Sequence, residues 1–454
     1  MRIIIAGCGK LGLMLARTLV NEDHDLTVID SDDAALERVE ELDVLPVRGS
    51  AVSVESLEEA GVKNADILIA TTRSDESNML CCIMGCRLGA KYTIARIRDP
   101  EYLKNMSFVT QELGINYVAN PERATAREIS RMLRLPFAAS GVETFVRGLV
   151  EMVEIRVQGD EPFVGVPLCD VFKGRHPLPR VLFCGVKRGD ESIIPKGDFV
   201  IREGDSLFVT TDFATLSAFL RQVGKTSKVA KDALIIGGSR TAFYLAGLLT
   251  ESGVKTKLIE LKEDKARYLD EQLKSTDVIW GDGTDQELLL SEGLKNTDAF
   301  VALTDRDEEN LMVGLYATRV CKGRVIVKNN RVSYSELLRE MGLDSIISPS
   351  QIACNIILRA VRARIAGENS GVERMYKLMG GHAEALELIV PEGAAYLGKT
   401  FAALNVDANS LIAVIVRGNK VTVPTGADHL EAGDHVVVIT MGRAIVTLDD
   451  ILKV

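Results

Sequence analysis

The stretch IIIAGCGKLG at residues 3–12 places three glycines in the pattern GxGxxG directly after a β-branched apolar run. In this pattern Gly7 permits a tight turn, Gly9 lets a pyrophosphate approach the backbone, and Gly12 allows close packing of helix on strand. The amides at the start of the helix then face the phosphates. Asp30 ends the next strand, where a carboxylate accepts both ribose hydroxyls and repels a 2′-phosphate. The stretch therefore predicts a nucleotide-binding turn that favours NAD over NADP.

Further apolar runs follow this turn, separated by segments with helical spacing of apolar residues. Alternating strand and helix patterns are typical of a doubly wound parallel sheet, whose ligands bind at the carboxyl ends of the strands. Arg73 and Arg98 follow the fourth and fifth runs, so they are candidate contacts for phosphate or adenine. The six expected strands are residues 2–7, 26–30, 44–49, 66–72, 92–97 and 115–120.

The same series recurs about 230 residues later, which indicates a duplication. Adding 230 carries Gly7 to Gly237 and Asp30 to Glu260, and adding 232 carries Asn78 to Asn310. A second sheet of the same kind is therefore expected. Its strands are predicted at residues 233–238, 257–261, 278–283, 299–304, 324–328 and 344–348.

The second turn lies in ALIIGGSRTAFYLA, residues 233–246, and it keeps only part of the glycine pattern. Ser239 and Ala242 stand where Gly9 and Gly12 stand in the first copy. Glu260 retains the carboxylate that would hold a ribose. We interpret this stretch as a second, diverged nucleotide site whose ligand differs from that of the first.

A shorter repeated module follows each of these units. Pro195 and Pro424 correspond at an offset of 229, as do Gly204 and Gly433, and turn residues stand before apolar strands in both copies. The fold class is therefore α/β: two Rossmann-like, doubly wound parallel-sheet domains, each followed by a small α+β domain. Glycine and polar residues interrupt the patterns at the boundaries. The predicted domains are N1 at 1–135, C1 at 136–228, N2 at 229–367 and C2 at 368–454.

Composition narrows the classes of function. The 454 residues carry a formal net charge of -10, which argues against a nucleic-acid partner. No apolar run approaches the roughly 20 residues of a membrane-spanning helix, and the first residues do not resemble a signal peptide, so a cytoplasmic location is expected. The eight cysteines lie mostly in apolar runs, which favours reduced, buried thiols over disulfides or a metal cluster.

The sequence offers no evident reaction centre. An NAD-dependent dehydrogenase needs a proton donor or acceptor beside the nicotinamide, and none of the five histidines lies in a motif with a paired acid. No metal site and no catalytic residue is therefore predicted, and two nucleotide sites without chemistry suggest a sensor. The competing hypothesis is an NAD-dependent oxidoreductase with a duplicated Rossmann domain.

Arginines form a stripe on one predicted helix. In PERATAREISRMLRL, residues 121–135, Arg123, Arg127 and Arg131 recur at steps of four and so share one face of the helix. A solvated face is the ordinary explanation, and docking or dimerisation is the alternative.

The chain closely resembles the family of regulator-of-conductance-of-potassium (RCK, or KTN) domains, in the tandem arrangement of the peripheral subunits of Trk potassium-uptake systems. The resemblance rests on IIIAGCGKLG with Asp30, on TTRSDESNML and ARIRDPEY, on the degenerate second unit, and on EGDSLFV and AGDHVVVI in the small modules. It covers essentially the whole chain.

The resemblance implies a cytoplasmic regulatory protein attached to the inner face of the cell membrane, beneath a Trk-type integral membrane potassium channel subunit. It implies a homo-oligomer, either a dimer or a tetrameric ring, that binds NAD(H), with ATP or ADP at either site. Regulation of another cation channel or antiporter remains an alternative. The implied first site contains Gly7, Cys8, Gly9, Lys10, Leu11, Asp30, Ser50, Ala51, Arg73, Ser74 and Arg98, and the second contains Gly237, Gly238, Ser239, Arg240, Thr241, Glu260, Asp282, Asp305 and Arg306.

Overall fold

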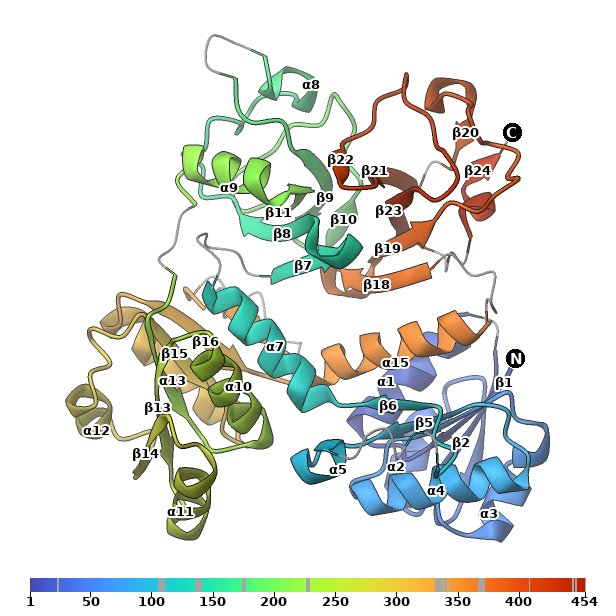
Figure 1. Cartoon of the computed structure of the whole chain (residues 1–454), viewed down its shortest axis with the longest axis vertical. Helices are drawn as coiled ribbons and strands as arrows, with labels where there is room; N and C mark the ends of the chain where they lie inside the picture. The colour runs from blue at the N-terminus through green and yellow to red at the C-terminus, as the bar shows by residue number, and fades with distance from the viewer. Residues whose placement is uncertain are drawn as a thin grey trace.

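The computed structural model describes the chain as four blocks that follow one another in sequence (Figure 1). The predicted boundaries at 135, 228 and 367 lie outside the described residues, so we use N1, C1, N2 and C2 below for the four main sheets with their helices. The structure describes residues 1–454 except 23, 105–109, 111, 135–140, 174–176, 226–228, 331–337, 339–340, 344, 366–371, 408, 443–444, 446 and 454.

N1 is a six-stranded parallel sheet in the order β3-β2-β1-β4-β5-β6. The order reverses between β1 and β4, which places the turn after β1 at the switch point where such sheets bind ligands. All six predicted strands are confirmed. The strands are β1 Arg2–Ala6, β2 Asp25–Asp30, β3 Val44–Arg48, β4 Ile67–Ala70, β5 Thr93–Arg96 and β6 Tyr117–Ala119; the helices are α1 Lys10–Val20, α2 Asp33–Leu36, α3 Val54–Glu59, α4 Asp75–Leu88, α5 Pro100–Lys104 and α7 Pro121–Arg134.

N2 repeats this sheet in the order β14-β13-β12-β15-β16-β17, which confirms the predicted duplication. The strands are β12 Asp232–Ile236, β13 Lys255–Glu260, β14 Thr276–Trp280, β15 Ala299–Ala302, β16 Arg324–Lys328 and β17 Ser345–Ile347; the helices are α10 Arg240–Glu251, α11 Glu263–Gln272, α12 Gln286–Ser291, α13 Asp307–Val320 and α15 Pro349–Ile365.

C1 and C2 are antiparallel sheets in the orders β10-β9-β11-β8-β7 and β18-β19-β23-β21-β22. Phe145 and Met152 of C1 share one buried apolar cluster with Met379 and Val437 of C2, so the two sheets pack on each other. The elements of C1 are β7 Gly141–Phe145, β8 Val150–Arg156, α8 Leu168–Val171, β9 Leu182–Arg188, β10 Glu191–Ile193, β11 Ser206–Asp212 and α9 Phe213–Gln222; those of C2 are β18 Val372–Leu378, β19 Ala383–Ile389, β20 Asn405–Val406, β21 Ser410–Arg417, β22 Lys420–Thr422, β23 His435–Met441 and β24 Leu452–Lys453.

The last helix of each parallel-sheet unit packs against the other unit. Helix α7 follows the N1 sheet, but Ile129 and Leu133 lie in the apolar core of N2. Helix α15 follows the N2 sheet, but Ile357 and Leu358 lie in the core of N1. The two helices meet between the blocks (Figure 1). Each unit therefore completes its core with a helix from the other, which ties N1 to N2.

C1 and C2 differ in how they are joined to N1, N2 and the two exchanged helices. On α15, Arg362 has a side chain only 3% exposed, and it pairs with Glu22 of N1 and with Glu384 of C2, the latter at 2.7 Å. The same helix also joins the cores of N1 and C2 into one apolar cluster. The joint between N1, α15 and C2 is therefore both apolar and ion-paired.

The equivalent joint of α7 lacks this ion pair. An offset of 228 relates Arg134 to Arg362, but Arg134 donates to Ser252 of N2 at 3.2 Å. Glu151 of C1 corresponds to Glu384, and its Oε2 is buried without a hydrogen-bond partner. Burial is the main reason why the pKa of Glu151 rises from its ordinary value of 4.5 to about 7; the charge of Arg131 lowers the pKa and that of Glu128 raises it.

Among the described residues, none of the helices combines the length and the apolar character that crossing a membrane requires. Six of the eight cysteines are buried, whereas Cys86 and Cys169 are exposed.

We expect Glu151→Gln to stabilise the protein, and to do so more at pH 8 than at pH 6. The native state holds the proton more tightly than the unfolded chain, so the free energy of unfolding falls as the pH rises from about 4.5 to about 7, and the penalty is complete above that range. A shift of this size corresponds to about 3 kcal/mol. Urea unfolding at the two pH values measures it.

Glu384→Gln is the matched control, because it removes half of an ion pair at the equivalent position. It should destabilise the protein by about 3 kcal/mol at both pH values, since Arg362 would lose a buried partner. Equal gains from Glu151→Gln at pH 6 and pH 8 would contradict the titration.

Candidate nucleotide sites

The first glycine turn has the geometry that its sequence predicts. Gly7 has φ +105°, and a Cβ there would lie 2.9 Å from the carbonyl carbon of Thr71, so only glycine fits. A Cβ on Gly12 would overlap the carbonyl oxygen of Gly7, which explains the close packing of α1 on the turn. A Cβ on Gly9 would meet nothing within 4 Å. The space beside Gly9 is therefore open for a ligand.

Helix α1 begins without a side-chain cap. Its N-cap residue is Gly9, which offers no oxygen to the amides of the first turn. Such orphan amides attract anions, and the helix dipole adds to the attraction. The start of α1 is thus a phosphate-binding end that the chain itself leaves unfilled.

The Asp30 carboxylate lies directly beside this turn. One oxygen accepts from the amide of Cys8 at 2.6 Å, and the other accepts from the amide of Asp32 at 3.0 Å. A carboxylate has about four lone-pair positions, so acceptor capacity remains for ribose hydroxyls. The thiol of Cys8 points the other way, donating to the carbonyl of Ala35 at 3.2 Å, and belongs to the core.

A cavity of about 410 Å³ extends from the turn along the ends of β2, β3 and β4. It brings together Gly7, Gly9, Asp30, Ser50, Ala51, Arg73 and Ser74, all of which were predicted for the first site. Ser74 also caps α4, because its hydroxyl accepts from the amide of Ser77 at 3.1 Å.

Arg98 is fixed between the first site and N2. Its Nε donates to Asp75 at 2.9 Å, and its Nη2 donates to the carbonyl of Arg73. The carbonyl oxygen of Arg98 accepts from the hydroxyl of Tyr244 at 2.9 Å. Arg98 therefore connects the strand ends of N1 with helix α10 of N2.

In the second turn, a side chain of the turn itself caps the helix that follows. Gly237 has φ +85°, as Gly7 has a positive φ in N1. The hydroxyl of Ser239 caps α10 by accepting from the amide of Ala242 at 3.3 Å. Ser239 thus fills one of the amide positions that a phosphate would use at the start of α1.

Glu260 is held more tightly than Asp30. Its carboxylate accepts from the amides of Gly238 at 2.8 Å and Lys262 at 2.9 Å, and it pairs with Lys265 at 3.2 Å. Burial acts to raise the pKa of Glu260, but these hydrogen bonds and the charge of Lys265 leave it below its ordinary value. A Cβ on Gly238 would lie 2.7 Å from Glu260 Oε2, so this glycine makes room for the longer acid.

Of the other residues predicted for the second site, Arg240, Thr241 and Asp305 line one cavity with the turn, whereas Asp282 and Arg306 do not. Asp282 accepts from the amide and hydroxyl of Thr284, at 2.8 and 2.7 Å, which lowers its pKa. Asp305 is 92% exposed at its side chain, and Arg306 pairs with Glu309 at 2.6 Å. The first site is therefore assembled more completely than the second.

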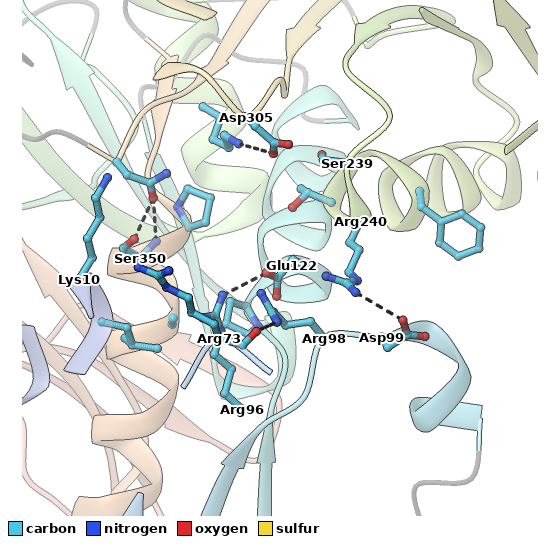
Figure 2. Close-up of a pocket in the computed structure, with 18 of the residues that line it drawn as sticks. Lys10, Arg73, Arg96, Arg98, Asp99, Glu122, Ser239, Arg240, Asp305 and Ser350 are labelled. Carbon is cyan, nitrogen blue, oxygen red and sulfur yellow. Dashed lines mark hydrogen bonds and ion pairs between the residues drawn. The ribbon is translucent and has the colours of Figure 1, made fainter. Parts of the chain in front are cut away.

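A larger cavity of about 940 Å³ lies between N1 and N2 and borders both turns (Figure 2). Arg96 pairs with Glu122 at 3.3 Å, and Arg240 pairs with Asp99 across the two units at 3.5 Å. Eight cationic side chains line the cavity against three carboxylates, so it favours anions. The cations are Lys10, Arg38, Arg73, Arg96, Arg98, Arg240, Lys265 and Lys328.

Sequence reasoning did not assign Lys265 or Tyr268 to the second site. The offset of 230 was the available signal, because it places them opposite Ala35 and Arg38 of N1, which line the first site. Where N1 has Ala35, N2 has Lys265, and this lysine is the cation that pairs with Glu260.

The chain is similar to known protein families and to named relatives along nearly its whole length. The TrkA-N domain family matches residues 3–121 and 233–349, and the TrkA-C domain family matches residues 152–224 and 385–453. The Trk system potassium uptake protein TrkA of Haemophilus influenzae is 32% identical over 96% of this chain and 95% of its own. A TrkA homolog from Archaeoglobus fulgidus is 30% identical over 100% of both chains.

Solved structures agree on the fold. The GsuK RCK domain has a TM-score of 0.61 at 20% identity and covers 97% of this chain and 92% of its own. The GsuK channel bound to NAD has a TM-score of 0.60 at 20% identity, covering 97% of this chain and 76% of that one. With its four matched domains alternating along the sequence, the chain belongs to the TrkA family of Trk system potassium uptake proteins.

Proposed function

We propose that N1 binds NAD(H) and that the chain thereby regulates potassium uptake by a Trk-type integral membrane channel subunit. The chain is a Trk potassium uptake regulatory protein of the RCK type. The nucleotide proposal rests mainly on the start of α1. This helix start has no side-chain cap, and its Gly9 lines the same cavity as Asp30. The GsuK channel bound to NAD supports the choice of nucleotide.

We further propose ATP or ADP as ligands at either site. The cationic cavity between N1 and N2 shares Gly9 and Arg73 with the cavity at the first turn, so it offers charge to additional phosphates. In N2 the Ser239 cap and the Glu260–Lys265 pair leave less of the phosphate turn free. A different ligand, or a differently placed phosphate chain, is what the second site would accept.

A nucleotide would act on the channel by changing the relation of N1 to N2. It shifts a gate only by its difference in affinity for the two gate states, commonly about 1–3 kcal/mol. The polar contacts between N1 and α10 include the hydrogen bonds of Tyr244 with Arg98 and Asn120 and the Arg240–Asp99 pair. Because Arg98 also touches the loop of Arg73, occupancy of the first site reaches N2 through these groups.

We propose that the protein assembles as a homo-oligomer, a dimer or a tetrameric ring, on the cytoplasmic face of the membrane. Leu80 on α4 is 46% exposed, and Met312, its equivalent on α13, is 68% exposed. Exposed apolar residues at equivalent positions of both units favour contacts between copies of the chain. The division into domains at 1–135, 136–228, 229–367 and 368–454 remains part of this proposal.

Blocking the first turn should abolish NADH binding without unfolding N1. Gly9→Trp enters open space at an ordinary extended φ of -67°, so it should fold and fill the phosphate position. At NADH concentrations near 100 times Kd, wild type gains about 2.7 kcal/mol of stability, and the variant should gain none. Thermal unfolding with and without NADH measures this.

Glu260→Gln tests the second site in the same assay. It should leave NADH binding at N1 intact, whereas a change in the affinity for ATP or ADP would support a ligand in N2. If NADH stabilises Gly9→Trp as much as wild type, the assignment of the first site is wrong. Oxidation of NADH by candidate carbonyls, followed at 340 nm, would instead favour the oxidoreductase.

Tyr244→Phe should uncouple the two units while sparing the ligand. It removes a hydroxyl that donates to the Arg98 carbonyl at 2.9 Å, and it touches neither Asp30 nor the glycine turn. We expect unchanged NADH affinity and a roughly fivefold smaller effect of nucleotide on reconstituted channel flux, corresponding to about 1 kcal/mol. Tyr316→Phe, at a tyrosine of α13 that lines none of the cavities described here, is the control. An undiminished response in Tyr244→Phe would rule out this route.

Leu80→Asp combined with Met312→Asp should lower the oligomeric state, because two charges would enter the proposed contact. Light scattering after size-exclusion chromatography gives the mass. Leu45→Asp, at a 56% exposed position on strand β3, should leave the mass unchanged. A wild-type mass for the double variant would place the contact elsewhere.

A further inference from the structure

A third cavity, of about 550 Å³, lies where α7 and α15 pass each other beneath C1 and C2. Its walls come from both helices and from β7 and β18, and it shares no lining residue with the cavities at the nucleotide turns. It therefore sits at the joint between the parallel-sheet units and the small sheets. Figure 1 shows α7 and α15 converging at this level.

The arginine stripe of α7 faces this cavity. Arg123, Arg127 and Arg131 all line it, and Arg359 of α15 lines it from the opposite side. Within the described part of the chain, the guanidinium groups of Arg123, Arg127 and Arg359 make no hydrogen bond or ion pair. Burial lowers the pKa of Arg127, and the like charge of Arg123 lowers it further. Three cations thus share one space without a direct ion pair, although the charge of Arg359 acts on Glu143.

Arg131 forms the inner end of the same group, with a side chain 19% exposed. It pairs with Glu128 at 2.6 Å and donates to the hydroxyl of Thr144 at 3.0 Å, while Glu143 lies 3.6 Å away. Its Nε is buried and has no partner. One donor of the innermost guanidinium is therefore still unused.

The carboxylates of the cavity do not neutralise this charge. Glu128 and Glu143 both line it, and Glu128 is committed to Arg131. Burial, followed by the charge of Glu128, raises the pKa of Glu143 well above its ordinary range, which favours its neutral form. Because four arginines face two carboxylates, the cavity keeps a net positive charge in either form of Glu143.

The internal symmetry of the chain shows that α7 contributes most of this positive charge. The offset of 228 that relates the two helices carries Arg127 to Asn355 and Arg131 to Arg359. Asn355 also lines the cavity, and its side-chain oxygen accepts from Gln351 at 3.1 Å. Its amide hydrogens remain available, so α15 contributes a neutral donor opposite the arginines of α7.

We propose that this cavity binds a compact phosphate-bearing anion, held between the arginines of α7 and Arg359 of α15. Guanidinium groups bind phosphate oxygens through paired, charge-assisted hydrogen bonds. A bridging anion would fix α7 relative to α15. Because α7 packs into N2 and α15 packs into N1, the same anion would set the relation between the two nucleotide units. The site would thus act as a second input, separate from the glycine turns.

Titration calorimetry of the full-length Gly9→Trp variant with inorganic pyrophosphate tests the proposal, because the first turn is blocked there. Arg127→Gln and Arg359→Gln should each weaken pyrophosphate binding about tenfold or more, since each removes charge-assisted hydrogen bonds. Arg202→Gln, at an exposed arginine of C1 outside the cavity, is the charge-matched control and should not change the affinity. Unchanged melting temperatures would show that the variants fold.

A second titration with ADP separates the two sources of such an anion. Binding of ADP that depends on Arg127 and Arg359 would identify an organic phosphate, and binding of pyrophosphate alone would identify an inorganic one. Equal pyrophosphate affinity in Arg127→Gln, Arg359→Gln and Arg202→Gln would overturn the site. So would the absence of pyrophosphate binding at millimolar concentration. Neither result depends on whether N1 binds NAD(H).

Discussion

The exchange of α7 and α15 between the two parallel-sheet units is the constraint on which the rest of the structure depends. A helix that supplies apolar side chains to another unit's core cannot be withdrawn without exposing that core to water. Ile129 and Leu133 complete N2, and Ile357 and Leu358 complete N1. The units therefore cannot drift apart, and changes between them are restricted to movement about the exchanged helices. The cavity between the nucleotide turns and the cavity at the joint both owe their walls to this exchange.

The contacts of α15 with N1 and C2 differ in kind from the contacts of α7 with N2 and C1, although the two helices are equivalent members of the repeat. Around α15, apolar packing and the Arg362 ion pairs unite N1 with C2. Around α7, the core of C1 stays separate from that of N2, and Glu151 has no cation at the equivalent position. Polar joints exchange their hydrogen bonds with water more readily than apolar cores lose their packing. Around α7 the polar contacts with C1 include those of Arg131 with Thr144 and Glu143.

Sequence alone predicted most of the fold because its strongest signals are local and occur twice. Strand patterns, the glycine turn and the constant offsets predicted both six-stranded sheets, with the turn after β1 at the switch point. The exchange of α7 and α15 was not predicted, because the pattern of Ile129 and Leu133 reveals an apolar face but not which core receives it. For the first site, Asp30 and Gly9 lie where the motif places them. For the second site, the sequence predicted the carboxylate of Glu260. Its ion pair with Lys265 was not predicted, because that pair depends on how the side chains of α11 pack.

The two copies of the duplicated unit differ in how their first long helices, α1 and α10, are capped. Helix α10 carries its own oxygen on Ser239, whereas α1 begins on Gly9 and depends on water or a ligand to satisfy the same amides. The second unit thus supplies from its own side chain one of the contacts that the first unit leaves to solvent or a ligand. A phosphate at the start of α10 would have to displace the hydroxyl of Ser239, whereas a phosphate at the start of α1 would displace no protein group.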